Sequence, residues 1–390
     1  MRRRQLPVTA AVVAALAAPV LLAAPAAAAP PADLRVATFN ASLNRATEGE
    51  LVADLSTPDD PQAREVAEVV QRVRPDVLLV NEFDFAPEAV DLLRDNYLEV
   101  GQNGAEPIEY AHAFIAPSNT GVPSGFDLNN DGTVGGPDDA LGFGAFPGQY
   151  GMLVLSRYPI AQDEVRTFQD FLWKDLPGAR IPEGFYTPEE LAVLPLSSKS
   201  HWDVPVQVGG RTVHVLASHP TPPTFDGPED RNGRRNADEI LFWRQYVQPG
   251  AQSRALYDDE GRRGGLGGGE RFVIVGDQNS DPLDGDSLPG AAEQFLTAHR
   301  VVDPAPGSDG GIEAAQLQGG ANTTHRGDPG VDTADFGEPN PGNLRVDYVL
   351  PSKPMQVRGS GVFWPMAADP LARLNDASDH HAVWVDLRVR

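Results

Sequence analysis

The chain has 390 residues, contains no cysteine, and carries 31 Lys and Arg residues against 55 Asp and Glu residues, a formal net charge of −24. The absence of cysteine excludes disulfides, thiolate metal sites, a cysteine nucleophile and a lipoprotein anchor. The acidic charge disfavours loose binding of polyanions through a broad basic face, but not a nucleic acid held locally at a metal centre.

The first residues follow the pattern of a secretory signal. Three arginines at positions 2–4 precede an apolar, alanine-rich run over 8–24, and a series of small residues ends at Ala29. We therefore expect residues 1–29 to be a signal peptide cleaved near Ala29, and the mature protein to be secreted. The run is short for a membrane anchor and no later run has membrane length, so we expect no membrane span.

Residues 30–390 are predicted to form one domain with long loops. Gly and Pro concentrate in four stretches, and the short apolar runs between them have the length of strands. The predicted strands are 34–40, 76–80, 152–155, 204–208, 212–217, 272–275, 346–350 and 382–389, and the predicted helices are 61–74, 234–247 and 291–299. The Gly209-Gly210 pair between two alternating runs predicts a β-hairpin.

Polar side chains follow the predicted strands at the point where each apolar run ends or the next begins. Taken singly, each is compatible with a turn or a solvated strand end. Their recurrence at successive strands indicates a convergent site, because strand ends are rigid supports for side chains. The clusters are Phe39-Asn40, Asn81-Glu82, Ser218-His219, Gly276-Asp277-Gln278-Asn279, Arg345-Val346-Asp347-Tyr348 and Ser378-Asp379-His380.

These motifs, in this order and together with Leu155-Ser156-Arg157-Tyr158-Pro159-Ile160, resemble the endonuclease/exonuclease/phosphatase superfamily, the deoxyribonuclease-I-like fold. The resemblance covers most of the chain after residue 30. It implies an α/β (α+β) fold: a four-layer αββα sandwich of two packed, mostly antiparallel sheets with long loop insertions. It also implies the hydrolysis of phosphoesters with a divalent metal ion.

The resemblance also implies residue roles. The metal ligands would be Asn40 and Glu82, with Asp379 in or near the shell, and such oxygen ligands suit Mg²⁺ or Mn²⁺. His380 would activate water, with Asp347 orienting its ring. The residues implied to contact or act on the scissile phosphate are His219, Asp277 and Asn279, the role of Asp277 as acid, base or metal ligand being open.

Three positions are weaker candidates for substrate contact. Tyr150 precedes the strand at 152–155 where some relatives carry a tyrosine. Relatives place a phosphate-binding cation near the next strand, where either His201 or Lys199 could serve, and a solvated strand end is the alternative. A hydroxyl residue often precedes the Asp347 motif, which suggests Thr323 or its neighbour Thr324, in a stretch that could equally be a solvated loop.

The insertion 101–148 contains a loop over 127–138 that resembles an EF-hand calcium loop. Acids and amides occupy its ligand positions, a glycine stands at position 6, and the backbone of the seventh residue would complete the set. The twelfth residue is Asp rather than Glu, and an Asx-rich turn is the alternative. A structural Ca²⁺ is predicted here, with the ligands Asp127, Asn129, Asp131, Thr133 and Asp138.

The expected function is that of a secreted phosphoester hydrolase, similar to phosphodiesterases and nucleases, in which a His-Asp pair activates water. The substrate would be a nucleic acid or a small organic phosphate. One alternative is a phosphomonoesterase that acts on small phosphates such as phytate. Another is a non-catalytic binding protein on the same fold, which would be expected to lack at least one of the metal or histidine positions. No obligate protein partner is evident from the sequence.

Overall fold

The computed structural model describes residues 5, 7 and 31–390. The predicted signal peptide over 1–29 therefore lies outside the described residues, apart from residues 5 and 7. Among the described residues, no helix combines the length and the apolar character needed to cross a bilayer.

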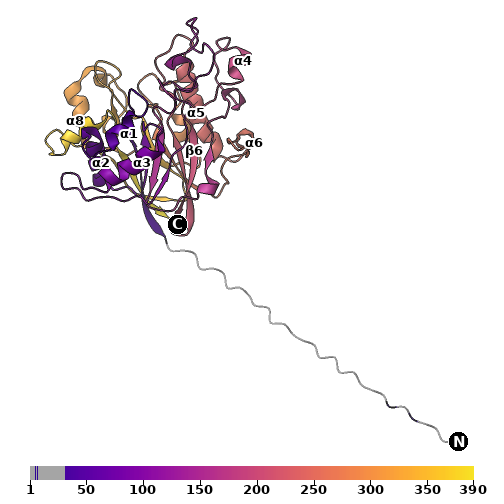
Figure 1. Cartoon of the computed structure of the whole chain (residues 1–390), viewed down its shortest axis with the longest axis horizontal. Coiled ribbons are helices and arrows are strands. Elements are labelled where there is room, and N and C mark those ends of the chain that lie inside the picture. Colours follow the sequence, from indigo (N-terminus) through magenta and orange to yellow (C-terminus); the bar gives the residue numbers. More distant parts are fainter. Residues whose placement is uncertain (1–4, 6, 8–30) are drawn as a thin grey trace.

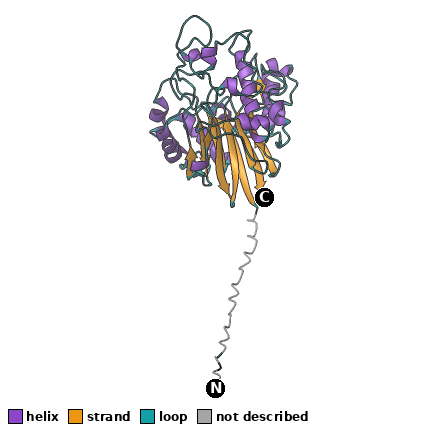
Figure 2. Cartoon of the chain, turned by 90° about the vertical axis from the view of Figure 1, so that its right-hand side faces the viewer, coloured by secondary structure: helices purple, strands orange, loops and turns teal. Residues whose placement is uncertain are grey.

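Two β-sheets form the centre of the molecule (Figure 2). The six-stranded sheet has the order β12-β13-β1-β2-β4-β3, and the five-stranded sheet has the order β11-β8-β7-β6-β5. The pairs β1–β2 and β7–β8 are parallel, and the other pairs are antiparallel. The first sheet contains β1 (Ala32–Asn40), β2 (Val77–Asn81), β3 (His112–Phe114), β4 (Met152–Ser156), β12 (Gln356–Val362) and β13 (Val383–Val389). The second contains β5 (Arg166–Thr167), β6 (His201–Val208), β7 (Arg211–Ser218), β8 (Arg271–Asp277) and β11 (Asp347–Pro351), and a separate ribbon pairs β9 (Ala334–Asp335) with β10 (Asn343–Leu344).

Helices cover the outer faces of both sheets, as Figures 1 and 2 show. Their bounds are α1 (Glu50–Leu55), α2 (Pro61–Val73), α3 (Pro87–Leu93), α4 (Pro188–Leu191), α5 (Arg231–Val247), α6 (Ala251–Ala255), α7 (Glu293–Leu296) and α8 (Asp309–Gln318). A π-helical turn, η1 (Arg94–Leu98), follows α3, and short 3-10 segments are η2 (Pro137–Asp139), η3 (Gln162–Glu164), η4 (Trp173–Asp175), η5 (Gly320–Thr323), η6 (Pro329–Val331) and η7 (Ala372–Ala377).

Three apolar clusters hold these layers together. Alternate residues of both sheets, such as Val36, Val204 and Val385, form the cluster between the sheets. A second cluster lies between the first sheet and α1 to α3, and a third lies between the second sheet and α5 and α7. The predicted αββα sandwich is confirmed, and its sheets are mixed rather than purely antiparallel.

Local sequence signals account for the boundaries of the long elements. Asp60 caps α2 by accepting a hydrogen bond from the backbone N–H of Ala63, Pro61 occupies the first turn, and Arg74 ends the helix with a left-handed φ of 53°. The predicted hairpin at Gly209-Gly210 joins β6 to β7, and both glycines have positive φ. Helix α5 begins three residues earlier than the predicted start at 234, at Arg231.

Strand β12 and helix α8 are among the elements that the sequence pattern does not predict. Strand β12 contains Gly359 and Gly361, which weaken a strand signal. A Cβ added at Gly361 would lie 2.9 Å from the Trp384 ring, so this glycine lets β12 pair closely with β13. Helix α8 lies within the glycine-rich insertion, where Ser308 caps it by accepting a hydrogen bond from the N–H of Gly311.

Candidate active site

The two sheets are joined by hydrogen bonds at one end of the sandwich. Asn40 and Asn81 are partners at the ends of β1 and β2, and Asp277 is paired with Asp347 between β8 and β11. The Asn81 side chain connects the sheets: its Oδ1 accepts from the N–H of Asp277 at 3.1 Å, and its Nδ2 donates to the carbonyl of Ser218 at 3.4 Å. Because Asn81 is fully buried, these bonds fix the relative position of the strand ends that carry the polar clusters.

His380 and Asp347 form a buried pair. The Asp347 Oδ2 atom lies 2.8 Å from Nδ1 of His380, and both side chains are almost fully buried. The Thr333 hydroxyl donates to the same carboxylate oxygen at 2.9 Å and accepts from the N–H groups of Val346 and Asp347. This arrangement leaves Nε2 as the ring atom of His380 that is directed away from Asp347.

The Asp277 carboxylate is the centre of the cluster. Its Oδ2 accepts from Asn40 Nδ2 at 3.1 Å and lies 3.3 Å from Nε2 of His219 and 3.6 Å from Nε2 of His380. Its Oδ1 accepts from the N–H of Asn279 at 2.8 Å. Burial raises the pKa of Asp277, but the charges of His380 and His219 and these hydrogen bonds outweigh burial and lower it. Asp277 is therefore ionised at neutral pH.

The two histidines have opposite electrostatic environments. Burial lowers the pKa of His380, but the charges of Asp347 and Asp277 outweigh it and raise the pKa above its ordinary value. For His219, burial and the nearby Lys199 ammonium lower the pKa despite the contact with Asp277. The cluster thus holds one imidazole with a raised affinity for a proton, as a proton acceptor requires, and one with a lowered affinity.

Two of the three predicted metal ligands, Asn40 and Asp379, contact Ser42. Asn40 Oδ1 accepts from the N–H of Ser42 at 3.2 Å, and Asp379 Oδ1 accepts from the Ser42 hydroxyl at 3.2 Å. Glu82 directly follows β2 with a left-handed φ of 59°, and its carboxylate accepts no hydrogen bond from any other described residue. A second group of potential ligands, Asp277, Asp347 and His380, offers atoms that all lie within 4.8 Å of one another.

The chemistry of this donor set fits a divalent cation. Burial raises the pKa of the adjacent Asp84 to about 6 despite hydrogen bonds from the N–H groups of Arg45 and Tyr150, and the charge of Glu82 adds to the rise. The proximity of the Glu82 and Asp84 carboxylates favours a bound cation, because a positive charge would offset their mutual repulsion. The position of Glu82, half-exposed at a strand end, makes its carboxylate accessible for this role.

The sequence from residue 37 to residue 380 matches the model of the Endonuclease/Exonuclease/phosphatase family. The chain belongs to this family. Its members are phosphoester hydrolases that generally use a divalent metal ion, and this chain is accordingly a phosphoester hydrolase. No curated protein sequence gives a significant match.

Several solved structures are similar to this chain. An endonuclease/exonuclease/phosphatase from Beutenbergia cavernae DSM 12333 is 18% identical with a TM-score of 0.50, and the match covers 92% of this chain and 72% of that one. Sphingomyelinase C from Streptomyces griseocarneus is 16% identical with a TM-score of 0.46, covering 91% of this chain and 99% of that one. A mannosyl-6-phosphatase from Bacteroides thetaiotaomicron VPI-5482 is 13% identical with a TM-score of 0.44, covering 91% and 99%.

The predicted substrate-contact residues of this endonuclease/exonuclease/phosphatase protein lie in different places. Tyr150 is half-buried, its N–H donates to Asp84, and burial together with the charges of Glu82 and Asp84 raises its pKa, so it borders the site. Thr323 lies in η5, and its hydroxyl donates to the carbonyl of Gly320. It is Thr333, ten residues later in the same insertion, whose hydroxyl contacts Asp347.

His201 lies in the hydrophobic core. Its side chain is 1% exposed, its ring packs against Phe242 and Trp243, and its Nε2 lies 3.1 Å from the carbonyl of Glu239. This position suits packing rather than contact with a substrate. The alternative cation, Lys199, is also buried, and the carboxylates of Glu239, Glu82 and Asp277 all act on its pKa, which burial nevertheless lowers.

His219 and Asn279 meet the cluster from β7 and from the turn after β8. The acid that faces His219 is Asp277, a pairing that the sequence alone does not reveal. The Nδ1 atom of His219 has no hydrogen-bond partner among the described residues. Asn279 has a left-handed φ of 50°, and its Nδ2 donates to the carbonyl of Pro220 at 3.1 Å. One amide hydrogen of Asn279 thus remains for another acceptor.

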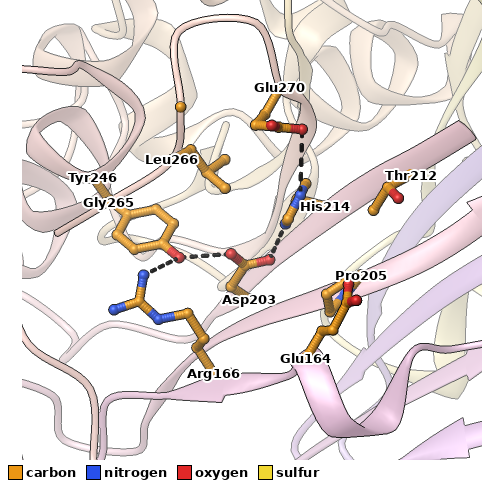
Figure 3. A pocket seen from close by; sticks show the side chains of 11 residues that line it. Glu164, Arg166, Asp203, Pro205, Thr212, His214, Tyr246, Gly265, Leu266 and Glu270 are labelled. Atoms are coloured by element: carbon orange, nitrogen blue, oxygen red, sulfur yellow. Dashed lines mark hydrogen bonds and ion pairs between the residues drawn. The ribbon is translucent and has the colours of Figure 1, made fainter. Parts of the chain in front are cut away.

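A separate polar cluster lies on the outer face of the five-stranded sheet, in a hollow of about 420 Å³ (Figure 3). Asp203 is central: its Oδ1 lies 2.7 Å from Nδ1 of His214, and its Oδ2 accepts from the Tyr246 hydroxyl at 2.6 Å. Glu270 lies 3.9 Å from Nε2 of His214, and Arg166 donates to the Tyr246 hydroxyl. None of the residues lining this hollow belongs to the cluster around Asp277.

We expect the His214–Asp203 pair to stabilise the protein in a pH-dependent manner. Burial lowers the pKa of His214, but the hydrogen bond and charge of Asp203, with smaller contributions from Glu270 and Glu164, raise it overall. A raised pKa gives stability that is complete below the unfolded value of about 6.5 and is lost as the pH rises through the folded value. His214→Gln is therefore expected to lower the free energy of unfolding by about 1.5–3 kcal/mol at pH 5.5, and by less at pH 9.

Urea unfolding at both pH values measures this difference. His299→Gln, at an exposed position, is the control and should change the free energy of unfolding little at either pH. An equal loss for His214→Gln at pH 5.5 and pH 9 would show that the pair does not stabilise the fold through the charge of the imidazole.

Proposed function

We propose that this chain is a secreted, metal-dependent phosphodiesterase in which His380 and Asp347 activate water. The observation that supports this most directly is the buried His380–Asp347 pair, which directs Nε2 of His380 toward the cluster formed by Asp277 and His219. An oriented imidazole beside a group of phosphate-binding donors is suited to the attack of water on phosphorus.

The proposed reaction is a single displacement. In the neutral form of His380, Nε2 takes a proton from water as the water oxygen bonds to phosphorus. The ester P–O bond then breaks, and the leaving oxygen takes up a proton from solvent to give the free alcohol. Asp347 keeps the ring in position and stabilises the imidazolium that results. A bound Mg²⁺ or Mn²⁺ would neutralise phosphate charge as it develops, and the residues proposed to hold it are Asn40, Glu82 and Asp379.

The proposed phosphate contacts come from two further side chains. His219 faces Asp277 through Nε2, and Asn279 keeps an amide hydrogen free. Donors at these positions would stabilise the equatorial phosphate oxygens in the transition state more than in the ground state. The buried Lys199 ammonium adds positive charge near Asp277 and Glu82. Tyr150, at the border of the site, is the proposed contact to the substrate beyond the phosphate.

A comparison of substrates tests this proposal. Plasmid DNA, RNA, an aryl phosphodiester, the matching aryl monoester and phytate would be hydrolysed side by side with Mg²⁺. We expect the diester to be turned over at least about tenfold faster than its monoester, because the site offers one imidazole and one amide rather than a cluster of arginines for a dianion. Faster release of phosphate from the monoester or phytate would instead identify a phosphomonoesterase. Absence of turnover of both the diester and the nucleic acids would contradict the proposed phosphodiesterase activity.

We also propose that the loop 127–138 binds Ca²⁺. The side chains of Asp127, Asn129 and Asp131 fold inward and accept backbone N–H groups within the loop. Asp138, the twelfth residue, is exposed, whereas Asp139 is buried and accepts from the N–H groups of Leu128 and Gly135. Protection of this loop from proteolysis by Ca²⁺ in the wild type, but not in Asp127→Ala, is expected. Equal cleavage with and without Ca²⁺ would contradict the proposal.

Export is the remaining part of the proposal. The arginines and the apolar run that suggest a signal peptide lie outside the described residues, apart from residues 5 and 7. Expression of the full chain in a bacterial host followed by N-terminal sequencing of the secreted product is expected to show a start near Pro30. Retention of the uncleaved chain in the cytoplasm would contradict it.

A further inference from the structure

A small, partly enclosed cavity of about 20 Å³ lies between the 303–343 insertion and Asp284, next to α8. The polar side chains that line it are those of Asp284, Asn322, His325 and Asp332. A cavity of this volume has room for one water molecule or one ion. It shares no lining residue with the cluster around Asp277.

Asp332 is the unusual residue of this cavity. It is 6% exposed, and its carboxylate forms no hydrogen bond or ion pair with any described residue, although its oxygens are not among the fully buried side-chain atoms without a partner. The neighbouring acids do have hydrogen-bond partners. Asp284 accepts hydrogen bonds from the N–H groups of Arg326 and Gly327, and Asp328 accepts one from the N–H group of Gly330. A buried carboxylate without a partner is costly, and such groups in proteins are either neutralised or coordinate a metal.

The surroundings of Asp332 are negatively charged. Burial, followed by the charges of Asp281, Asp284 and Asp328, raises the pKa of Asp332 to about 8. The arginines of the adjoining segments pair with other acids: Arg345 forms an ion pair with Asp303, and Arg326 pairs with Asp284 and is 73% exposed at its side chain. No described arginine or lysine therefore neutralises Asp332.

We propose that this cavity is a Ca²⁺ site in which the carboxylates of Asp332 and Asp284 are ligands. Two carboxylates at a cavity of single-ion size provide the oxygen donors that Ca²⁺ requires, and the flexible coordination of Ca²⁺ allows backbone carbonyls or water to complete the set. A divalent cation would convert the repulsion among these acids into attraction. The site is separate from the loop 127–138 and from the three proposed active-site ligands.

The position of the cavity connects it to the catalytic pair. Asp332 directly precedes Thr333, whose hydroxyl donates to Asp347. The next residue, Ala334, is bridged to His380, and the N–H of His381 donates to the carbonyl of Thr333. On the other side, Asp281 accepts the N–H of Arg345, two residues before Asp347. A cation bound here would therefore hold in place the chain segments that contact Asp347 and His380.

Counting bound calcium tests the proposal. The full secreted chain, Asp332→Asn and Asp328→Asn would be dialysed to equilibrium against Ca²⁺, and the bound ions measured by atomic emission. Asp332→Asn is expected to bind one ion fewer than the wild type. Asp328→Asn has the same charge change four residues away, at an exposed position outside the lining, and should bind as many ions as the wild type. An equal count for Asp332→Asn and the wild type would overturn the proposal.

Thermal unfolding supplies a second measurement. In EDTA, Asp332→Asn is expected to unfold at a temperature no lower than the wild type, because the amide removes a buried charge that has no partner. Ca²⁺ should raise the unfolding temperature of the wild type more than that of Asp332→Asn, and Asp284→Asn should show the same reduced response. A Ca²⁺-dependent rise that both variants retain in full would show that neither carboxylate is a ligand.

Discussion

Replacing His380 with alanine is expected to lower kcat by about 10²–10⁴-fold, the contribution typical of a positioned general base. Asp347 holds the His380 ring at Nδ1. No other described imidazole occupies the same place, because His219 faces Asp277 from the end of β7. KM should change far less than kcat, because Nε2 acts on the attacking water rather than on the bound ester. Steady-state kinetics on the preferred substrate of the panel measure both constants.

A matched control separates this effect from a general loss of histidine or of folding. His299→Ala removes an exposed imidazole and should keep full activity. Because His380→Ala leaves the Asp347 carboxylate buried with Thr333 as its side-chain partner, the variant should also be less stable, and kinetics would be measured well below its unfolding temperature. A variant that is folded and retains more than a tenth of the wild-type kcat would contradict the assigned role.

Removing divalent metal is expected to abolish activity, and Glu82 is expected to set the concentration of metal that restores it. EDTA should eliminate turnover, and Mg²⁺ or Mn²⁺ should recover it. Glu82→Gln removes a carboxylate that has no hydrogen bond to other described residues, so the fold should change little while the negative charge offered to the cation falls. We expect at least a tenfold higher Mg²⁺ concentration at half-maximal activity, the lower end of the effect of changes around metal ligands.

The control for this prediction is Glu88→Gln, which makes the same change at an exposed position in the first turn of α3. It should require the same Mg²⁺ concentration as the wild type. Both titrations are made at one fixed Ca²⁺ concentration, so that the proposed calcium sites stay in one state. If Glu82→Gln were activated by the same Mg²⁺ concentration as the wild type, the metal would be held by other residues, and the group Asp277, Asp347 and His380 would be the next to test.

Most long elements were predictable because their signals are local. Alternating apolar residues, proline at a helix start and the Gly209-Gly210 pair act over a few residues, and the strands β1, β2, β4 and β7 lie within two residues of the predicted bounds. Strand β12 and helix α8 were not predictable, because their sequences are rich in glycine. Their formation depends on packing against distant segments. Strand β12 pairs with β13, and Gly310 at the start of α8 packs against the backbone of Trp364.

The contrast between His201 and Thr333 shows the limit of local reasoning about a site. Strand β6 begins at residue 201 rather than 204, so alternation turns Trp202 toward the space between the sheets and His201 toward α5, where it is buried. Thr333 stands fourteen positions before Asp347 in the sequence. It reaches that carboxylate because the β9–β10 ribbon and the bridge from Ala334 to His380 fold the insertion back onto the strand ends.

The sequence by itself determined the strand-end motifs, the order in which they occur and hence the family, since each motif is a short run of residues beside a strand. Only the tertiary structure decided which atoms face one another. Asp277 meets Asn40, His219 and His380, and Asn81 bonds the two sheets together, through contacts between residues 58 to 237 positions apart that no local pattern records. The unpartnered carboxylate of Asp332 likewise could not be identified from the sequence, because its burial and its neighbouring charges both depend on the folded chain.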